Sequence, residues 1–205
     1  MSGVDITTLP LQKQRRGLSI IPQEPVMFTG TLRENLDPFN DHEDEELCQL
    51  VDEVGLTSQM ASVGGLNGFV AGSGSERWSV GQMQLVCLIR AALNKVPIVC
   101  LDEATAALDP HTEHHVLEVA DRLFKTRTVL TIAHRLDAVI STDTVVVMEQ
   151  GKVAETGAPA TLLGDRTSWF SKLVDMSGPQ EAAHLRQVAA KHFAETHHQL
   201  TAVTE

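Results

Sequence analysis

The sequence predicts an α/β fold in which a mostly parallel sheet is covered by helices on both faces. Two short apolar segments, 96–101 and 128–133, are expected to be strands, and the amphipathic segment 112–124 between them is expected to be a helix. Strands that alternate with helices form parallel sheets that those helices cover. Ligands of such sheets bind beyond the carboxyl ends of the strands, so the residues that follow each strand are candidate site residues.

Composition places the chain among ordinary globular proteins. It has 205 residues, 42% hydrophobic and 21% charged, enough for one domain with a tail. A net charge of -11 argues against a nucleic-acid partner, because phosphate binding needs clustered lysines and arginines. Cys48, Cys87 and Cys100 fit neither a metal motif nor a disulfide framework, and they predict reduced, buried thiols in a cytosolic setting. No apolar run approaches the roughly 18 residues that a membrane helix needs.

Periodicity and turn residues predict the other elements in chain order. The N-terminal half is expected to contain a turn-like segment (1–16), a strand (17–21), a helical region interrupted at Asp37-Pro38 (31–60), a glycine-rich loop (64–74) and an amphipathic helix (81–94). Asp41 is the candidate N-cap in the helical region. The C-terminal half adds a short helix (136–140), a strand (144–148), a turn (149–152), a hairpin strand (153–155) and, from Ser177, a helix or a frayed tail.

Two adjacent carboxylates, Asp102 and Glu103, end the apolar strand 96–101. A carboxylate at this edge can hold Mg²⁺, directly or through water, while the metal bridges phosphate oxygens. A second carboxylate can orient and deprotonate an attacking water. The competing interpretation is a strand that ends in charge because it reaches solvent.

Other polar groups are expected at the same edge. His134 follows the strand 128–133 and can donate to a phosphate or position a water, although a lone histidine is more often structural. Gln23 follows the strand 17–21 and offers an amide oxygen to a metal. The turn 79–82 precedes a helix and supplies N–H groups and a hydroxyl, which form an anion site.

A phosphate loop of the form G-x-x-x-x-G-K-[ST] is absent from this sequence. Its Gly-Lys pair, Gly151-Lys152, is followed by Val153 and lacks the upstream glycine. The chain therefore carries most of the parts of a nucleotide-hydrolysing site without the main phosphate cradle.

These motifs resemble those of the nucleotide-binding domain of ATP-binding-cassette (ABC) transporters, a P-loop NTPase-like (RecA-like) fold with an inserted helical subdomain. The correspondences are Ser79-Val80-Gly81-Gln82 with the signature motif, 96–103 with the Walker B strand, Ala106-Ala107-Leu108-Asp109 with the D-loop, His134 with the switch histidine and Pro22-Gln23 with the Q-loop. The stretch 19–39 is most similar to the second nucleotide-binding domain of the multidrug-resistance-associated (C) subfamily. The resemblance runs from about Gly3 to Val174.

The resemblance implies roles for individual residues. Asp102 and Gln23 would serve the Mg²⁺ shell, Glu103 would be the general base, and His134 would sense the γ-phosphate. ATP held by a partner domain would contact the signature motif and D-loop residues, namely Ser79, Val80, Gly81, Gln82 and Asp109. Implied partners are a second nucleotide-binding domain in a head-to-tail dimer and the transmembrane domains of an exporter, at the cytoplasmic face of a membrane.

Departures from the family pattern limit these expectations. The family domain begins with strands, an adenine-stacking aromatic and the phosphate loop. Residues 1–6 of this chain match the sequence that normally follows all of these. Met83 replaces the usual arginine after the signature, Ala106 replaces a common D-loop serine, and residues 74–77 also differ. We expect a partial ATPase domain over 1–176, with its helical subdomain at about 30–94, and a helical or disordered tail over 177–205.

Four hypotheses follow. The first is the C-terminal part of an exporter ATPase domain that is truncated before the Q-loop, and the second is an inactive gene fragment. The third is a non-catalytic partner that donates its signature motif in trans, and the fourth is a soluble ABC-type ATPase.

Without the phosphate loop, the chain alone is expected to bind ATP no tighter than about 1 mM. Loss of a central strand is expected to expose backbone edges and lower solubility.

Overall fold

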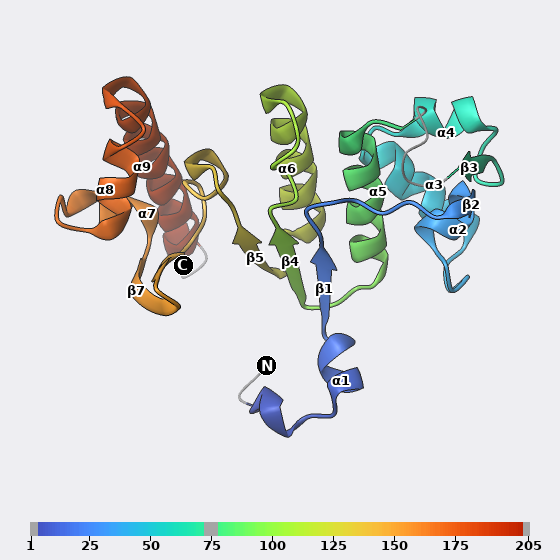
Figure 1. The fold of residues 1–205 in the computed structure, drawn as a ribbon, viewed down its shortest axis with the longest axis horizontal. Coiled ribbons are helices and arrows are strands. Elements are labelled where there is room, and N and C mark those ends of the chain that lie inside the picture. The colour runs from blue at the N-terminus through green and yellow to red at the C-terminus, as the bar shows by residue number, and fades with distance from the viewer. Residues whose placement is uncertain (1–3, 72–77, 203–205) are drawn as a thin grey trace. The chain divides into compact units, whose positions relative to one another are not determined.

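The computed structural model describes residues 4–71 and 78–202 (Figure 1). The chain divides into two compact units, Met1–Ile132 and Ala133–Glu205. Residues 74–77, where the sequence differs from the family pattern, lie outside the described residues. The domain division 1–176 and 177–205 stays a prediction, since the two compact units follow a different boundary.

A three-stranded parallel sheet lies at the centre of the first unit. Its strands are β1 (Leu18–Ile21), β4 (Ile98–Asp102) and β5 (Thr128–Ile132), in the order β1-β4-β5. The register pairs Ile21 with Leu101 and Leu101 with Thr131. The predicted α/β class with a parallel sheet is therefore confirmed.

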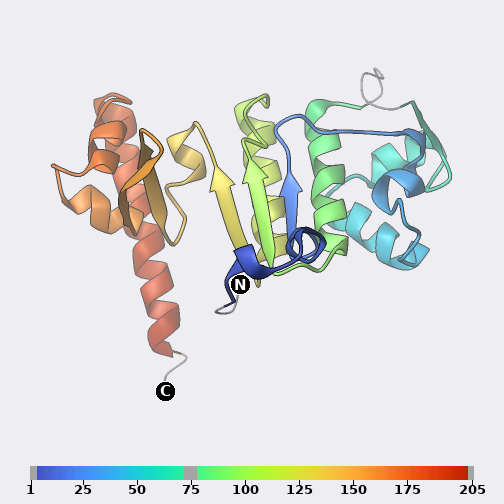
Figure 2. The same cartoon turned by 60° about the horizontal axis from the view of Figure 1, so that its bottom comes forward.

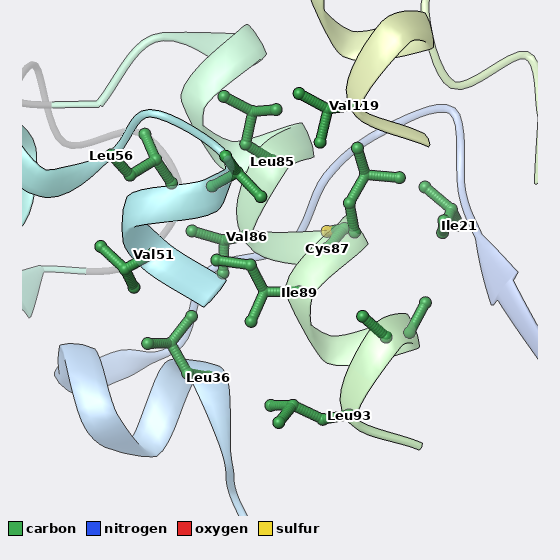
Figure 3. Close-up of a cluster of buried hydrophobic side chains, with 14 of the residues drawn as sticks. Ile21, Leu36, Val51, Leu56, Leu85, Val86, Cys87, Ile89, Leu93 and Val119 are labelled. Carbon is green, nitrogen blue, oxygen red and sulfur yellow. The ribbon is translucent and has the colours of Figure 1, made fainter. Parts of the chain in front are cut away.

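One face of this sheet is covered by α5 (Val80–Leu93) and α6 (Pro110–Phe124), and Figure 2 shows α6 behind the strands. Alternate residues of a strand point to opposite faces. Ile21, Val99 and Leu101 are buried on the covered face, where they join one core with α5 and α6. In Figure 3, α5 contributes more of the labelled side chains of this core than any other element.

The other face of the sheet exposes apolar side chains. Ile20, Cys100 and Leu130 form one row across the three strands. Ile20 is 62% exposed and Leu130 is 56% exposed. In the described part of the chain, helices therefore cover one face of this sheet, where the sequence predicted helices on both faces. Strands β1 and β5 are its two edges.

Between β1 and α5, in the region predicted to be a helical subdomain, the described residues form three helices and a small two-stranded sheet. The helices are α2 (Leu32–Leu36), α3 (Asp44–Glu53) and α4 (Thr57–Val63). Strand β2 (Thr29–Thr31) pairs antiparallel with β3 (Phe69–Ala71). The helical region predicted over 31–60 is confirmed, since Thr31 is the N-cap of α2. The loop predicted over 64–74 was wrong at β3, because a strand of three residues is stabilised by a partner about 40 positions away and carries little pattern of its own.

The predicted N-cap of α3 was also wrong. Glu43, rather than Asp41, is the N-cap residue. The N–H groups of Asp41 and His42 instead donate to the side chain of the buried Asp37, at 3.1 and 2.8 Å. Asp37 therefore stabilises the loop between α2 and α3, where the Asp37-Pro38 pair predicted a break in the helical region.

The N-terminal segment contains more helix than the predicted turns. Residues Ile6–Thr8 form a 3₁₀ turn, and α1 (Leu11–Arg15) follows. The three cysteines are free, as predicted, and Cys87 is buried, but Cys48 is exposed and Cys100 is half-buried, so the predicted burial was wrong at these two positions. Among the described residues, no helix is both long and apolar enough to cross a bilayer.

The second unit has its own core. It begins with a 3₁₀ turn (Leu136–Ala138) and continues with the hairpin of β6 (Val145–Glu149) and β7 (Lys152–Gly157). Helices α7 (Pro159–Gly164), α8 (Trp169–Asp175) and α9 (Pro179–Ala202) follow. Helix α9 buries Ala182, Leu185 and Ala189 in this core, so the segment after Ser177 is a packed helix.

We expect the 205-residue chain to self-associate through its open sheet face, because contiguous exposed apolar side chains and a free strand edge promote association. Leu130→Lys places a charge on this face and should shift the chain towards monomer in sedimentation velocity. Its free energy of unfolding should change by no more than about 0.5 kcal/mol.

Val99→Lys is the matched control on the same sheet, since Val99 is fully buried on the covered face. A buried unpaired charge should abolish cooperative unfolding. A wild-type chain that is monomeric and unfolds cooperatively would contradict the expectation.

Candidate functional site

The end of β4 places the two predicted carboxylates. Asp102 is exposed and pairs in register with Ile132 of β5. Glu103 has a φ of 49°, and its N–H donates to the carbonyl of Ile132 at 2.9 Å. A positive φ is uncommon for residues other than glycine and is often found at functional sites. The left-handed turn stops the strand and fixes the backbone from which the Glu103 side chain projects.

The loop after Glu103 leads directly into α6. The N–H of Ala106 donates to the carbonyl of Glu103 at 3.0 Å. Thr105 donates its hydroxyl to the buried Glu113 of α6, also at 3.0 Å. The segment that resembles the D-loop is therefore anchored to α6 by a side chain as well as by turn hydrogen bonds.

Asp109 ends this loop as the N-cap of α6. Its carboxylate accepts from the N–H groups of His111 and Thr112, both at 3.1 Å. The hydroxyl of Thr112, and then its N–H, lower the pKa of Asp109 below the usual 3.8. Asp109 is exposed, so its structural role as a cap leaves the carboxylate accessible to a neighbouring molecule.

Ser79 and Gln82 form a reciprocal cap at the start of α5. Ser79 Oγ accepts from the Gln82 N–H at 3.2 Å, and Gln82 Oε1 accepts from the Ser79 N–H at 3.0 Å. This capping box fixes both side chains. The serine hydroxyl can still donate its own hydrogen to a further acceptor, whereas the glutamine oxygen already accepts the hydrogen bond from the Ser79 N–H.

The start of α5 suits an anion. Ser79 and Val80 are exposed, and the first turn of α5 contains no acidic residue although the chain carries a net charge of -11. The first N–H groups of a helix have no partner within it, and the helix dipole makes that end positive. These groups can therefore receive a phosphate, and the anion site at residues 79–82 stays a prediction.

Gly81 is buried where α5 approaches α6. A Cβ atom at this position would lie 2.3 Å from Cγ2 of Thr112. The glycine therefore has a packing role, which the motif alone did not reveal. Thr112 contacts the signature turn through its methyl group and Asp109 through its N–H, so it links the two segments.

Gln23 is exposed two residues beyond the end of β1. Its backbone carbonyl accepts from Nε2 of Gln84, a buried residue of α5. Sequence reasoning missed Gln84, because a glutamine within a helix looks like a surface residue unless its contacts are known.

His134 is exposed and lies in the second unit, two residues beyond β5. Glu103 lies in the first unit, so the assignment of His134 to the same site as Glu103 stays a prediction. The first unit contains the other predicted residues, at the end of β4, after β1, at the start of α5 and at the start of α6.

Magnesium fits the chemistry of the donors in the first unit. The Asp102 carboxylate and the Gln23 amide are oxygen ligands, which Mg²⁺ prefers. Among residues 4–71 and 78–202, no group of three or more histidine, cysteine or acidic side chains is arranged to hold a metal by itself. Mg²⁺ would therefore need water and phosphate oxygens to complete its shell, as it usually does in nucleotide sites.

We expect Gly81→Ala to strain the contact between α5 and α6. Thr112→Ser removes the methyl group in the way, so the double variant should recover stability. The two positions should couple by about 0.5–3 kcal/mol in urea unfolding. Gly164→Ala is the control, because a Cβ there meets nothing within 4 Å. If Gly81→Ala costs the same free energy of unfolding with and without Thr112→Ser, the contact is refuted.

We expect Thr112→Val to raise the pKa of Asp109 towards 3.8, because it removes the hydroxyl that contributes most to the lowering. A lowered folded-state pKa gives stability that is fully present above the unfolded pKa and is lost as the pH falls through the folded pKa. The variant should therefore lose less stability on acidification. Carboxyl ¹³C NMR titration measures the pKa.

Asp165 is the internal control for this titration. Its pKa is lowered in the same way by the hydroxyl and N–H of Thr167, which lie at 2.7 and 2.8 Å. Thr112→Val should leave the pKa of Asp165 unchanged. A pKa of Asp109 that does not move would show that the Thr112 hydroxyl does not reach it.

Comparison with known proteins identifies the family. The ABC transporter family model matches residues 1–106. The chain is 44% identical over 204 residues to human ATP-binding cassette sub-family C member 4, covering 95% of this chain and 15% of the relative. The mouse protein of the same name is 46% identical over 184 residues, covering 89% and 14%.

A relative from Dictyostelium discoideum, ABC transporter C family member 3, is 43% identical over 190 residues, covering 92% of this chain and 13% of the relative. The chain thus spans about a seventh of the length of the curated relatives it matches. The family model covers more than half of the chain, and these relatives share one subfamily. The chain therefore belongs to the ABC transporter family, with its relatives in the C subfamily.

Proposed function

We propose that this chain is the catalytic part of an ABC exporter's nucleotide-binding domain, in which it promotes ATP hydrolysis that drives transport. The observation that carries the proposal is the end of β4. There a left-handed Glu103 follows Asp102 and is held by a hydrogen bond to the neighbouring strand. Such a backbone fixes a carboxylate next to a metal ligand.

In the proposed reaction, water attacks the γ-phosphorus of ATP and ADP leaves. Glu103 orients this water and accepts its proton. Bound Mg²⁺ would neutralise charge on the phosphate oxygens, with Asp102 and Gln23 in its shell. The N–H groups at the start of α5, together with the Ser79 hydroxyl, would receive the γ-phosphate of a second ATP, which the partner domain binds, as a helix N-terminus can.

The proposal requires partners. The β- and γ-phosphates need a phosphate loop, which the sequence lacks, so another segment must supply it. The signature turn, with Asp109, would contact ATP held by a second nucleotide-binding domain in a head-to-tail dimer. The transmembrane domains of the exporter would place this assembly at the cytoplasmic face of a membrane. The family resemblance assigns His134 the role of sensing the γ-phosphate.

A second candidate function is a non-catalytic partner that donates its signature turn to ATP bound elsewhere. The observation in its favour is the exposed, acid-free start of α5. A donor has no need of a general base, however, so Glu103 would then have no catalytic role. We therefore favour the catalytic proposal.

We expect hydrolysis of Mg²⁺-ATP when the chain is mixed with a polypeptide that carries the strands and phosphate loop with which the family's domain begins. Glu103→Gln should lower the rate about 10²- to 10⁴-fold, because it removes the general base. Binding of ATP should remain. Steady-state kinetics and a fluorescent ATP analogue measure the two effects, and the chain alone should bind ATP no tighter than about 1 mM.

Ser79→Asp separates the two candidate functions. Aspartate caps a helix as well as serine does, so the fold should persist, but its charge repels a phosphate at the start of α5. Loss of hydrolysis in both variants supports the catalytic proposal. Loss in Ser79→Asp with full activity in Glu103→Gln indicates a donor. A folded assembly without hydrolysis would refute the catalytic proposal.

A further inference from the structure

The segment 22–28, which follows β1 and includes Gln23, is held by side chains of α5. Nε2 of Gln84 donates two hydrogen bonds, to the carbonyls of Pro22 at 3.0 Å and of Gln23 at 3.1 Å. Both hydrogens of one amide group are thus used on two consecutive carbonyls more than 60 positions away. The side chain of Gln84 is fully buried, so water does not compete for these bonds.

Arg90 holds the far end of the same segment. Its guanidinium donates to the carbonyl of Val26 at 2.6 Å and lies 5.1 Å from the ring centre of Phe28. It also donates to the backbone and side-chain oxygens of Asn35. Asn35 in turn bonds the N–H and carbonyl of Phe28, at 2.7 and 2.9 Å. Two residues of one helix therefore fix both ends of the segment.

The oxygen of Gln84 indicates that its amide nitrogen is the important group. Oε1 is buried and has no hydrogen-bond partner among the described residues. An unpartnered buried polar atom is destabilising, and an apolar side chain of similar shape would avoid that cost. Leucine or methionine would pack as well at this position. A glutamine at this position is explained if its two donors position the carbonyls of Pro22 and Gln23.

We propose that Gln84 is a positioning residue that ties Gln23 to the signature helix. This inference rests on the proposed function in assigning Gln23 to the metal and the start of α5 to a phosphate. Gln84 lies five residues after Ser79, about 7.5 Å along the helix axis. Any displacement of the first turn of α5 by a bound phosphate therefore moves the backbone of Gln23 with it. In the head-to-tail dimer the metal at Gln23 and the phosphate at the signature turn belong to different ATP sites, and α5 would couple these two sites through Gln84.

The first test uses the chain without nucleotide. In the wild type, NMR should detect scalar couplings across the hydrogen bonds from Nε2 of Gln84 to the carbonyl carbons of Pro22 and Gln23. Gln84→Met, which keeps the volume and removes both donors, should speed amide hydrogen exchange over 22–28 by about 10-fold or more relative to the rest of the chain. Absent couplings, or unchanged exchange in the variant, would overturn the proposal.

Ser19→Ala is the matched control. Ser19 is a buried residue of β1 whose hydroxyl accepts from Asn94, the residue that ends α5, at 3.3 Å. This variant also removes a hydrogen bond between α5 and the β1 segment, but at a distance from Gln23. It should leave exchange over 22–28 unchanged relative to the rest of the chain.

The second test asks whether Gln84 acts through Gln23. In the complemented assembly, Gln84→Met should lower kcat about 10- to 100-fold, the loss expected when a catalytic group is misplaced by about 1 Å. In a Gln23→Ala background the same substitution should have no further effect. Additive effects would show a general structural role and overturn the proposal, as would an unchanged kcat.

The two tests separate this inference from the proposed function. If the wild-type assembly does not hydrolyse ATP, the catalytic proposal fails, and the couplings and exchange of the chain alone decide whether Gln84 positions Gln23. If the assembly is active and the couplings are absent, the catalytic proposal stands and the role of Gln84 is refuted.

Discussion

The burial of α5 is the constraint on which the first unit depends. Ten of its fourteen residues are buried, so the helix contacts the sheet, α6 and the helical subdomain around most of its circumference. Each fully buried aliphatic side chain contributes about 1.5–3 kcal/mol, which makes α5 the main source of cohesion in this unit. A helix enclosed in this way must satisfy its ends with side chains. Ser79 and Gln82 do so at the first turn, and Arg127 donates to the carbonyls of Ala91 and Ala92 near the other end, at 2.9 and 2.8 Å.

This enclosure gives the motif residues two roles at once. Gly81 lies in a phosphate-binding motif, but its missing side chain also makes room for Thr112. Asp109 belongs to the segment expected to reach a partner, and it also caps α6. Loss of function on substitution at either position is therefore ambiguous by itself. Variants that preserve the packing or the cap are needed to isolate the contribution of nucleotide contacts.

The sequence predicted the elements that local chemistry determines. The parallel strands, the helices α5 and α6 and the carboxylates at the end of β4 follow from apolar periodicity and from what comes after each strand. Contacts between distant segments were not predictable in this way. The two-stranded sheet of β2 and β3 depends on pairing across some 40 residues. Gln84 differs from a surface glutamine because it donates to carbonyls 61 and 62 positions away. The left-handed backbone of Glu103 was missed for a related reason, since this conformation is stabilised by a bond to Ile132 of the adjacent strand and not by a glycine.

The bare face of the sheet has a thermodynamic consequence. Whatever covers Ile20, Leu130 and the edge of β5 binds the folded chain and has no equivalent site on the unfolded one. By mass action, each tenfold rise in the concentration of such a ligand above its Kd adds about 1.4 kcal/mol to the apparent stability. The melting temperature of this chain is then a property of the mixture in which it is measured, and comparisons between samples have meaning at matched concentrations.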